Sequence, residues 1–531
     1  MPTLEWIGKD KVVNHHQEVP YRVLERQYSY DEAGQHAEDN GSENMIIHGD
    51  NLEALKALLP RYEGKVKCIY IDPPYNTGNE GWVYNDNVND PKIKRWLGEV
   101  VGKEGEDLSR HDKWLCMMYP RLKLLQRLLA EDGALFISID DVEFYNLRLI
   151  CNEIFGDHNF IATIIWRKNY APKGTAKHFS EDHDYILVYG KSAERWIPHK
   201  MPRTEKQNKA YKNPDNDPRG LWRPNNLAAR NFYSKGTYSI TCPSGRVIKG
   251  PPAGSYWRVS EEKFWEMDRD GRIWWGKDGN NVPAPKIFLS EVADGIVPQT
   301  FWSYEEVGHT QDAKKEIKTI FTGETPFDTP KPVRLIERIL QIASDPDSII
   351  LDSFAGSGTT AHAVLNMNKA DGGNRKFILV EMMDYADSIT AERVKRVIDG
   401  YGEDKKAVEG TGGNFSYYEL GPVLLLPNGN LNEEVGPQKI REYVYYMETK
   451  EPLPAEQPTD EPYFMGLCRN TAYYFYYERE SVTTLDHAFL ATVQTKAEGY
   501  TIYADLCAIP QETLRKHNIT FKKIPRDIAR L

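Results

Sequence analysis

VKCIYIDPPY, at residues 66–75, is the stretch of sequence that decides the fold of this chain. Residues 66–71 are apolar and rich in β-branched side chains, so they predict a buried strand that ends at Asp72. The two prolines after Asp72 favour neither a helix nor strand pairing, so the chain must turn outward there. In open α/β sheets the carboxyl ends of the strands are where ligands bind, so this stretch predicts an α/β fold with a site at Asp72.

Residues 72–75, the DPPY turn, suit one particular chemistry. An aromatic amine is a poor nucleophile because its lone pair is delocalised into the ring. The carboxylate of Asp72 and the carbonyl of Pro73 can accept its N–H bonds and localise that lone pair, an electrostatic effect that needs no metal. Tyr75 offers a flat face to an extruded base, and such stacking contributes roughly 1–3 kcal/mol. An ordinary proline turn is the alternative, but we take Asp72, Pro73, Pro74 and Tyr75 as the candidate catalytic residues.

A second motif, DSFAGSGT at residues 352–359, lies between an apolar strand at 349–351 and the start of a helix at 361–365. Its two glycines permit a tight turn, and the amino end of the helix favours an anionic group. A phosphate-binding P-loop is excluded, because that motif needs four residues between its glycines and then Lys followed by Ser or Thr. A further strand at 377–380 ends at Glu381, which is placed to accept hydrogen bonds from ribose hydroxyls.

Alone, this glycine loop (residues 352–359) would fit NAD, FAD or S-adenosylmethionine. The DPPY turn favours S-adenosylmethionine, because hydride transfer has no use for a group that holds an amine. For a methyl group to pass, Asp72 and Gly356 must flank one cleft, so the two halves of the sheet must meet. The candidate cofactor-binding residues are Asp72, Asp352, Phe354, Ala355, Gly356, Ser357, Gly358, Thr359 and Glu381.

With both motifs in this order, the chain resembles the β-class amino-methyltransferases of DNA, in which the catalytic motif precedes the cofactor motif. The likeness covers roughly residues 45–400 and extends to NTGNEGWVYND (76–86), FWS (301–303), GHT (308–310) and FDTPKP (327–332), which look like Mod subunits of Type III restriction-modification systems and their solitary relatives. The resemblance implies a Rossmann-like class I methyltransferase fold with circularly permuted motif order, S-adenosylmethionine as methyl donor and a homodimer. Asp at the head of the motif is typical of adenine-N6 members, and Ser of cytosine-N4 members.

The resemblance also implies roles for residues outside the two motifs. Asp50 would lie near the adenine of the donor, although it could equally cap the helix that follows it. Thr329, Lys331 and Pro332 fit the donor-binding motif that precedes the glycine loop. The loop from Trp166 to Tyr170 would help to enclose a flipped base, with plain packing as the alternative for Trp166.

Composition sets outer limits on the protein. The 531 residues carry a net charge of −11, and their longest apolar runs fall well short of the roughly 20 residues that a membrane span needs. No signal-peptide core is found at the amino end, and six scattered cysteines without a C-x-x-C pair indicate neither a disulfide framework nor a zinc site. We therefore expect a cytoplasmic bacterial protein, associated with the nucleoid, that binds no metal and no membrane.

Hydrophobic periodicity divides the rest of the chain. It predicts strands at residues 45–50, 134–139, 160–166, 185–189, 472–477 and 500–506, and helices at 51–59, 113–129 and 332–343. The predicted domains are an irregular amino-terminal arm (1–44), a catalytic half (45–190), an α+β target-recognition domain (191–325), a cofactor-binding half (326–402) and a small carboxyl-terminal domain of unassigned role (403–531).

Positive charge is concentrated in the predicted insertion. Residues 195–260 carry thirteen Lys or Arg against three acids, which suits the phosphates of duplex DNA, although a solvated charged surface is the alternative. Candidate base-reading residues are Arg223, Asn225, Asn226 and Arg230, since Arg pairs with guanine and Asn with adenine, but a loop-stabilising role is the commoner one.

Together these features predict a site-specific DNA adenine-N6 methyltransferase that acts on duplex DNA by base flipping. Cytosine-N4 is the alternative target. In a different class of function, the chain would be a DNA-recognition subunit for a separate restriction (helicase-nuclease) partner.

Overall fold

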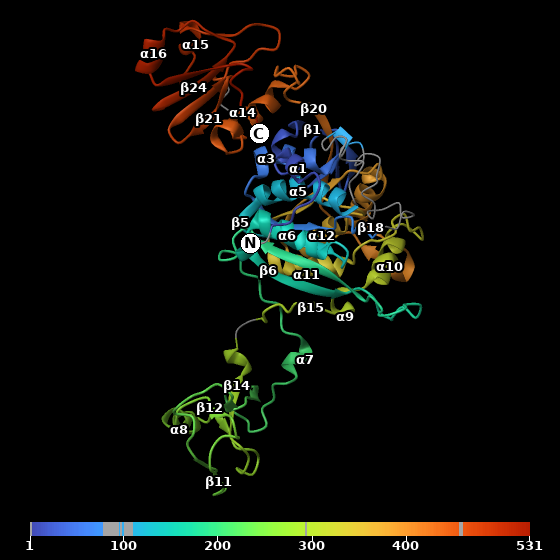
Figure 1. The fold of residues 1–531 in the computed structure, drawn as a ribbon, viewed down its shortest axis with the longest axis vertical. Coiled ribbons are helices and arrows are strands. Elements are labelled where there is room, and N and C mark those ends of the chain that lie inside the picture. The colour runs from blue at the N-terminus through green and yellow to red at the C-terminus, as the bar shows by residue number, and fades with distance from the viewer. Residues whose placement is uncertain are drawn as a thin grey trace. The chain divides into compact units, whose positions relative to one another are not determined.

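The computed structural model describes residues 3–77, 110–292, 295–455 and 460–530, and positions 95, 98 and 99 (Figure 1). The chain forms two compact units. The larger joins Met1–Pro198 to Gln299–Leu531, and the smaller, the inserted unit, is His199–Pro298.

Within the described residues, the larger unit is built on an eleven-stranded sheet. Its strands in spatial order are β15 (Phe301–Trp302), β6 (Phe160–Arg167), β7 (His183–Gly190), β5 (Leu129–Ile139), β4 (Val66–Ile71), β16 (Ile349–Asp352), β17 (Lys376–Glu381), β3 (Met45–His48), β20 (Asn414–Val423), β1 (Arg22–Asp31) and β2 (Gly34–His36). The run from β5 to β20 is parallel, whereas β7 and β1 pair antiparallel with their neighbours. The predicted Rossmann-like α/β methyltransferase fold is confirmed.

The permuted order has a direct structural consequence at the centre of the sheet. β4 pairs in parallel with β16, with Ile350 opposite Cys68 and Leu351 opposite Ile69, although these residues are far apart in sequence. From this junction the chain winds outward to β5 on one side and to β17 on the other. Such a reversal opens a crevice at the carboxyl ends of the strands, where α/β sheets bind ligands.

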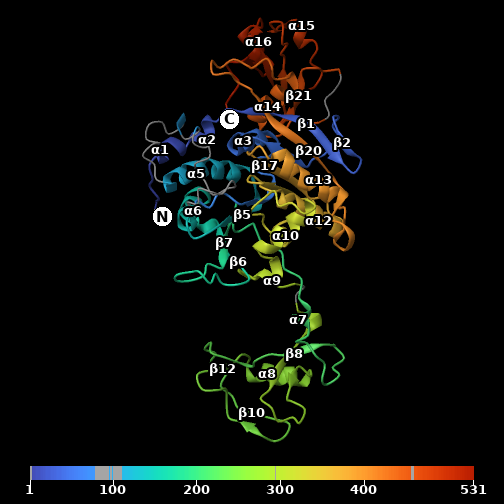
Figure 2. The ribbon, with the colours of Figure 1, turned by 90° about the vertical axis from the view of Figure 1, so that its right-hand side faces the viewer.

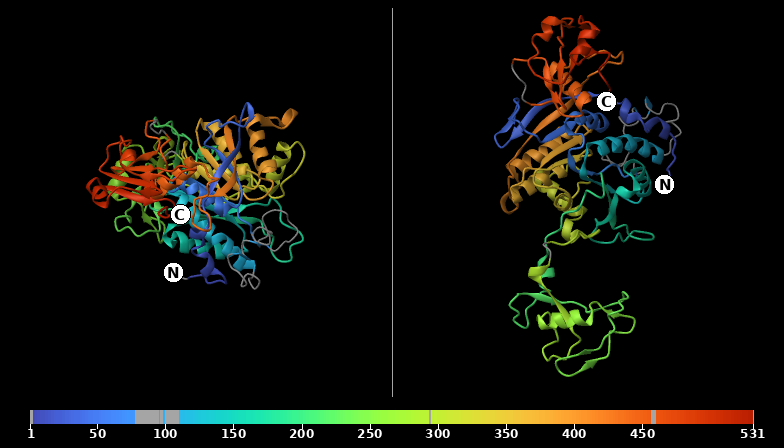
Figure 3. Two further views of the ribbon diagram at one scale, coloured as in Figure 1. Left: turned by 90° about the horizontal axis from the view of Figure 1, so that it is seen from above. Right: turned by 90° about the vertical axis from the view of Figure 1, so that its left-hand side faces the viewer.

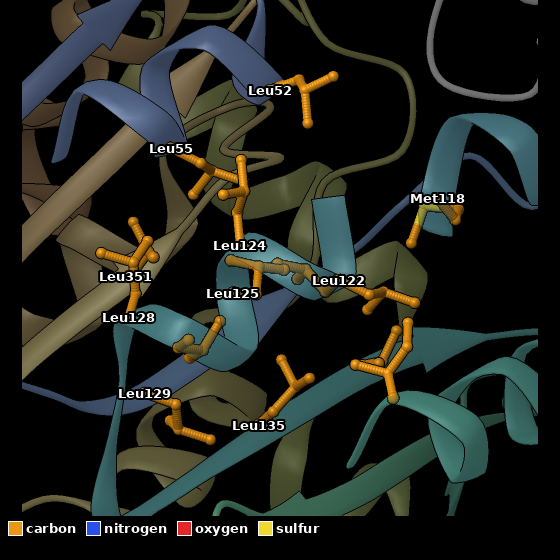
Figure 4. Packing of buried hydrophobic residues seen from close by; sticks show 14 of the residues in the cluster. Leu52, Leu55, Met118, Leu122, Leu124, Leu125, Leu128, Leu129, Leu135 and Leu351 are labelled. Atoms are coloured by element: carbon orange, nitrogen blue, oxygen red, sulfur yellow. The ribbon is translucent and has the colours of Figure 1, made fainter. Parts of the chain in front are cut away.

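Helices pack in two layers on the central strands (Figure 2). One layer holds α3 (Asn51–Tyr62), α5 (Arg110–Leu128) and α6 (Phe144–Phe155); the other holds α11 (Val333–Ala343), α12 (Thr359–Asp371) and α13 (Glu392–Asp399). Leu55 of α3 points toward Leu124 of α5, and both are buried, as is Leu52 (Figure 4). The helices predicted at 51–59, 113–129 and 332–343 are confirmed, with ends shifted by a few residues.

The expectation of an irregular arm over residues 1–44 is wrong. Residues 22–31 form strand β1, which pairs with β20 and so extends the main sheet. The pairing buries polar and aromatic side chains together: the hydroxyls of Ser29 and Ser416 lie 2.8 Å apart, and the rings of Tyr28 and Tyr417 stack at 5.0 Å. These alternating tyrosines look polar in sequence, but their rings supply the apolar surface that a sheet strand needs.

The segment 403–531 is likewise only partly separate from the sheet, since β20 belongs to it. Beyond β20 lie α14 (Pro437–Thr449) and a second sheet with strand order β21 (Phe464–Cys468), β22 (Thr471–Phe475), β24 (Gly499–Ala504) and β26 (Ile519–Lys523). The strands predicted at 472–477 and 500–506 correspond to β22 and β24. No helix in the described part of the chain is long and apolar enough to cross a membrane.

The inserted unit has its own small α+β core (Figure 3). A three-stranded sheet orders β13 (Ile273–Trp274), β14 (Ala284–Phe288) and β8 (Trp222–Pro224), and α8 (Glu261–Arg269) packs Phe264 against Trp275. The unit is narrower than the predicted 191–325, because residues after Gln299 pack with the larger unit, among them β15 and α10 (Thr310–Ile320).

Candidate active site

The DPPY turn leaves the sheet at the end of β4 and is held rigidly from behind. The indole N–H of Trp114, a buried residue of α5, donates to the Pro74 carbonyl at 2.6 Å. Asn76 follows in a left-handed conformation (φ 59°) and donates its amide to the carbonyl of Arg110 at 3.2 Å and to the carboxylate of Glu143. The backbone that would present the catalytic groups is therefore fixed before any ligand binds.

Glu143 is a site residue that the sequence did not suggest. Its carboxylate is fully buried and also bonds to His111 Nδ1 at 2.7 Å and to the Asn146 amide at 2.8 Å. These contacts satisfy a charge that burial would otherwise penalise, and they anchor the end of the DPPY turn through Asn76. In the sequence, only its acidic side chain could have suggested a role for Glu143, because its partners come from separate elements of the structure.

The two oxygens of the Asp72 carboxylate differ in their hydrogen bonding. Oδ2 accepts from the ammonium of Lys331, which also lies 5.1 Å from the centroid of the Tyr75 ring. Oδ1 is buried and has no hydrogen-bond partner of normal geometry, and neither has the buried hydroxyl of Tyr75, although that hydroxyl lies close enough to interact weakly with the Asp72 carboxylate. Burial, reinforced by the charge of Asp72, holds the pKa of Tyr75 well above its ordinary value, so this phenol is neutral. An unpaired buried acceptor is costly, and Asp72 Oδ1 is therefore an acceptor suited to a donor from a ligand.

The glycine loop requires both of its glycines. Gly356 and Gly358 have φ values of 52° and 80°, a region that other residues rarely adopt. A Cβ on Gly356 would lie 3.0 Å from Cζ of Phe327, and one on Gly358 would lie 3.0 Å from the carbonyl of Thr390. The Thr390 hydroxyl donates to the Gly356 carbonyl at 2.6 Å, which fixes the loop against the helix layer.

Two buried carboxylates at the ends of β16 and β17 hold this loop in shape. Asp352 accepts from the backbone N–H of Phe354 at 3.1 Å and from the Thr360 hydroxyl at 2.5 Å. Glu381 accepts from the backbone N–H groups of Gly356 at 2.8 Å and Met383 at 3.0 Å. Burial raises the pKa of each carboxyl group to about 7, against the opposing effect of these bonds. The role predicted for Glu381 toward ribose hydroxyls stays a prediction.

The DPPY turn and the glycine loop flank one cleft, as the sequence required. Its walls are formed by Tyr70, Asp72, Phe327, Thr329, Pro330, Lys331, Asp352, Phe354, Ala355, Gly356, Ser357, Thr359 and Thr360. Pro332 and Gly358 stand just outside this set, where they precede α11 and α12.

Asp50 caps the amino end of α3, which was the alternative to a role in binding the donor. Its Oδ1 accepts from the Leu52 backbone N–H at 2.8 Å, and its Oδ2 pairs with the buried Arg121 at 3.2 Å. Arg121 also bonds to Asn51, whose amide donates to the Ser353 carbonyl at 3.1 Å. Asp50 is thus linked to the glycine loop, while its predicted contact with the donor adenine stays a prediction.

The two residues predicted to enclose a flipped base, in the loop after β6, differ in exposure. Trp166 is buried and donates its indole N–H to the Gly308 carbonyl at 3.0 Å, so its ring is packed rather than presented to a base. Tyr170, by contrast, is 64% exposed. Asp184, which was not predicted as a site residue, is buried and accepts from Lys168 at 2.5 Å; burial raises its pKa.

The candidate base-reading residues lie on the inserted unit and fall into two groups, exposed arginines and asparagines that stabilise their own turn. Arg223 and Arg230 are exposed, and Arg223 donates to the Tyr211 hydroxyl at 3.2 Å. The amide oxygens of Asn225 and Asn226 accept backbone N–H bonds within their own turn, each at 3.0 Å, which is the loop-stabilising alternative. Of the motif at 76–86, positions 78–86 lie outside the described residues.

A parallel α/β sheet whose acidic DPPY turn and glycine loop meet at its central switch point defines a class I methyltransferase fold of permuted order. The chain belongs to the DNA methylase family, whose model matches residues 66–392.

Known relatives agree with this membership. The chain is 35% identical to the Type III restriction-modification enzyme StyLTI Mod subunit of Salmonella typhimurium, over 74% of this chain and 62% of that protein. It is 33% identical to the EcoPI Mod subunit of Escherichia phage P1, over 71% and 63%, and 32% identical to the Type II methyltransferase M.KpnI of Klebsiella pneumoniae, over 65% and 81%. The chain thus spans somewhat less than two thirds of the Mod subunits it matches.

Among solved structures, the PvuII DNA methyltransferase (cytosine-N4-specific) is matched over 66% of this chain and 86% of that one. The TM-score is 0.34 and the identity 13%, a likeness too weak to carry an argument. The fold assignment therefore depends on the strand order and on the family match.

Proposed function

We propose that this chain is a site-specific DNA methyltransferase that transfers a methyl group from S-adenosylmethionine to the N6 amine of an adenine flipped out of duplex DNA. The observation that carries the proposal is the unpaired, buried Oδ1 of Asp72, in the same cleft as the glycine loop. An acceptor without a donor, beside a loop suited to a nucleoside, is what an amine-directed group transfer needs. Membership of the DNA methylase family supports it.

The cleft fits S-adenosylmethionine in its chemistry. The glycine loop brings backbone close without side chains, and Phe327 and Phe354 supply apolar surface. The hydroxyls of Ser357 and Thr359, at the start of α12, offer polar contacts for the amino-acid end. When bound, this cofactor supplies an electrophilic methyl group on a sulfonium.

The residues of the DPPY turn would then orient and activate the amine. Asp72 Oδ1 and the Pro73 carbonyl each accept one N–H bond, so the nitrogen lone pair points away from both acceptors. Tyr75 stacks on the base and contributes roughly 1–3 kcal/mol. If the N–C bond formed while the methyl–sulfur bond of the donor broke and left a neutral thioether, the amine would have one proton to give up, and Asp72 would be the acceptor in contact with it. Lys331, now on Oδ2, holds the carboxylate in place.

The inserted unit is the proposed DNA-recognition surface, because residues 199–298 carry 17 Lys or Arg against 11 Asp or Glu, an excess of six positive charges. Since the relatives are Mod subunits of restriction-modification enzymes, we expect action within such a complex or as a solitary methyltransferase, with a homodimer as the working form. The expected location is the bacterial cytoplasm, at the nucleoid.

Modification-sensitive sequencing tests this proposal most directly. DNA from a methylation-free host that expresses the chain is compared with DNA from a host expressing Asp72→Ala. We expect N6-methyladenine at one recurring sequence, absent from the variant. N4-methylcytosine would keep the mechanism and change the target base. An unmodified genome, with the protein folded and expressed, would contradict the activity and favour a recognition subunit that needs a restriction partner.

A further inference from the structure

Arg393, on α13 behind the glycine loop, is a buried cation whose nearest counter-charge, the largely buried carboxylate of Glu316, makes no ion pair with it. Its side chain is 1% exposed, and no ion pair involves it in the part of the chain that the structure describes. Its Nε has no hydrogen-bond partner at all. Burial lowers the pKa of Arg393 to about 10, with partial compensation from the charge of Glu316, so the group is still a cation at neutral pH. A buried charge that is only partly compensated, and by no direct ion pair, is expensive and therefore needs a reason.

The guanidinium of Arg393 donates hydrogen bonds to residues that line the cleft. Nη1 donates to the hydroxyls of Ser357 and Thr359, each at 2.8 Å, and Nη2 lies 3.3 Å from His362 Nδ1. Burial and the charge of Arg393 hold the pKa of His362 well below its ordinary value, so this ring is neutral and adds no charge. Both hydroxyls belong to the wall of the cleft.

A hydroxyl that accepts a bond from a cation still has its own proton to donate. The two hydroxyls lie 3.3 Å apart, and that of Thr359 donates over a long 3.4 Å to the Lys331 carbonyl, so a ligand would have to replace that long bond. Polarisation by the cation makes that proton a better donor, and the effect is strongest where the dielectric is low. The hydroxyls of Ser357 and Thr359 stand at the amino end of α12, a helix of 13 residues, whose dipole also favours an anion. Three features thus favour negative charge at one point of the cleft.

We propose that Arg393 is a positioning residue that provides the buried positive charge for the carboxylate of the methyl donor, acting through the hydroxyls of Ser357 and Thr359. The inference rests on the proposed function and goes beyond it by assigning the binding of the amino-acid end. Of the groups that Arg393 contacts, the hydroxyls of Ser357 and Thr359 line the cleft and His362 does not, so the donor would contact Ser357 and Thr359.

A purely structural role explains the arrangement less well. The loop is already fixed by Thr390 on the Gly356 carbonyl and by Glu381 on the Gly356 N–H. Two hydroxyls could also be satisfied by a neutral side chain, without the desolvation of a guanidinium. Glu316 accounts for part of the charge, and an anion bound at the cleft would account for the donors that point to Ser357 and Thr359.

Calorimetric binding of three ligands by the full chain tests the inference. They are S-adenosylhomocysteine, its carboxamide (in which the carboxylate is replaced by a neutral amide) and 5′-methylthioadenosine, which lacks the amino-acid end. Arg393→Met is expected to weaken S-adenosylhomocysteine binding about tenfold or more and to change the other two by less than about threefold. Arg393→Lys is expected to recover part of the loss, because it restores the charge.

Arg375→Met is the matched control. Arg375 is also buried and lies just beyond the other end of α12, but it has an ion pair with Asp371 at 2.9 Å. Its substitution is expected to lower stability and leave the ratio of the S-adenosylhomocysteine and carboxamide affinities unchanged. Equal weakening of all three ligands by Arg393→Met would overturn the inference in favour of a structural role.

If Arg393→Met does not fold, the double variant Ser357→Ala and Thr359→Val keeps the inference testable with the arginine in place. It should also weaken S-adenosylhomocysteine selectively, and an unchanged affinity ratio would overturn the inference. A wild-type chain that binds none of the three ligands would overturn the proposed function together with it. Wild-type binding with no selective loss would overturn only the role of Arg393.

Discussion

The DPPY turn and the glycine loop follow adjacent parallel strands, yet their carboxylates are satisfied in opposite ways, although each region also has one buried hydroxyl without a partner, Tyr75 and Ser353. In the glycine loop, both oxygens of Asp352 and both of Glu381 accept hydrogen bonds from the loop itself or from residues beside it. In the DPPY turn, Asp72 Oδ1 and the Tyr75 hydroxyl are buried without partners. Since native structures satisfy most buried polar atoms, the first region is built to keep a shape and the second is left ready for a ligand.

Asp72→Ala should have the largest effect, because it removes Oδ1, the acceptor proposed to hold the amine, together with the partner of Lys331. We expect the rate of methyl transfer to DNA to fall by at least about 1000-fold, in line with the loss of a preorganised electrostatic group. Binding of S-adenosylhomocysteine should change little, since the shape of the glycine loop does not depend on Asp72. Single-turnover transfer and calorimetry measure the two quantities.

The control for this variant is Asp132→Ala. Asp132 also pairs with a lysine, Lys67, at 2.7 Å, but it lies away from the cleft. Its loss should leave the transfer rate unchanged. An Asp72→Ala protein that keeps more than about a tenth of the wild-type rate would break the distinction between the two regions.

Asp352→Asn should have the next largest effect, on the pH dependence of stability. Burial raises the pKa of Asp352 to about 7 in the folded protein, from an ordinary value of 3.8. Between about pH 4 and pH 7 the folded state therefore binds more protons than the unfolded state, so the free energy of unfolding falls as the pH rises. This contribution is fully present below about pH 4 and is lost above about pH 7.

Urea unfolding at a series of pH values measures this slope, which amounts to at most about 1.4 kcal/mol per pH unit for one group. Asparagine can keep both hydrogen bonds, so the variant should fold and show a flatter profile. Asp132→Asn serves as the comparison, because Lys67 holds the pKa of Asp132 below its ordinary value and outside this window. Parallel profiles for wild type and Asp352→Asn would show that this carboxylate is not the shape-keeping group inferred here.

Gly356→Ala should cost about 1–3 kcal/mol of stability, from the positive φ and from the contact of the new Cβ with Phe327. Gly372→Ala separates the two causes, because Gly372 has a φ of 70° but open space around its Cβ position. Chemical denaturation should therefore show the larger loss for Gly356→Ala. The affinity for S-adenosylhomocysteine should fall in Gly356→Ala and stay unchanged in Gly372→Ala. Equal losses of stability in the two variants would mean that close packing of the glycine loop does not matter.

Local sequence pattern predicted the two regions well, because each is a short apolar strand followed by residues with strong backbone preferences. The predicted strand at 66–71 and the structural strand Val66–Ile71 coincide. The contacts that distinguish the regions could not be predicted. Lys331 reaches Asp72 across 259 positions, and Arg393 reaches Thr359 from another helix. Such pairings depend on the packing of distant elements, as does the pairing of β1 with β20 that the sequence analysis missed.

The smallest expected effect comes from Tyr75→Phe, and its sign sharpens the comparison. Removing a buried hydroxyl that has no partner should raise stability by up to about 1 kcal/mol, while the ring that stacks on the base stays in place. Tyr70→Phe is the matched change, since the Tyr70 hydroxyl is also buried but lies 2.9 Å from the Ser138 hydroxyl, so its loss should lower stability. Opposite signs in thermal unfolding, with transfer rates within about threefold of wild type, would place the function of Tyr75 in its ring. A transfer rate reduced more than about tenfold in Tyr75→Phe alone would instead assign the hydroxyl to the ligand, as Asp72 Oδ1 is assigned here.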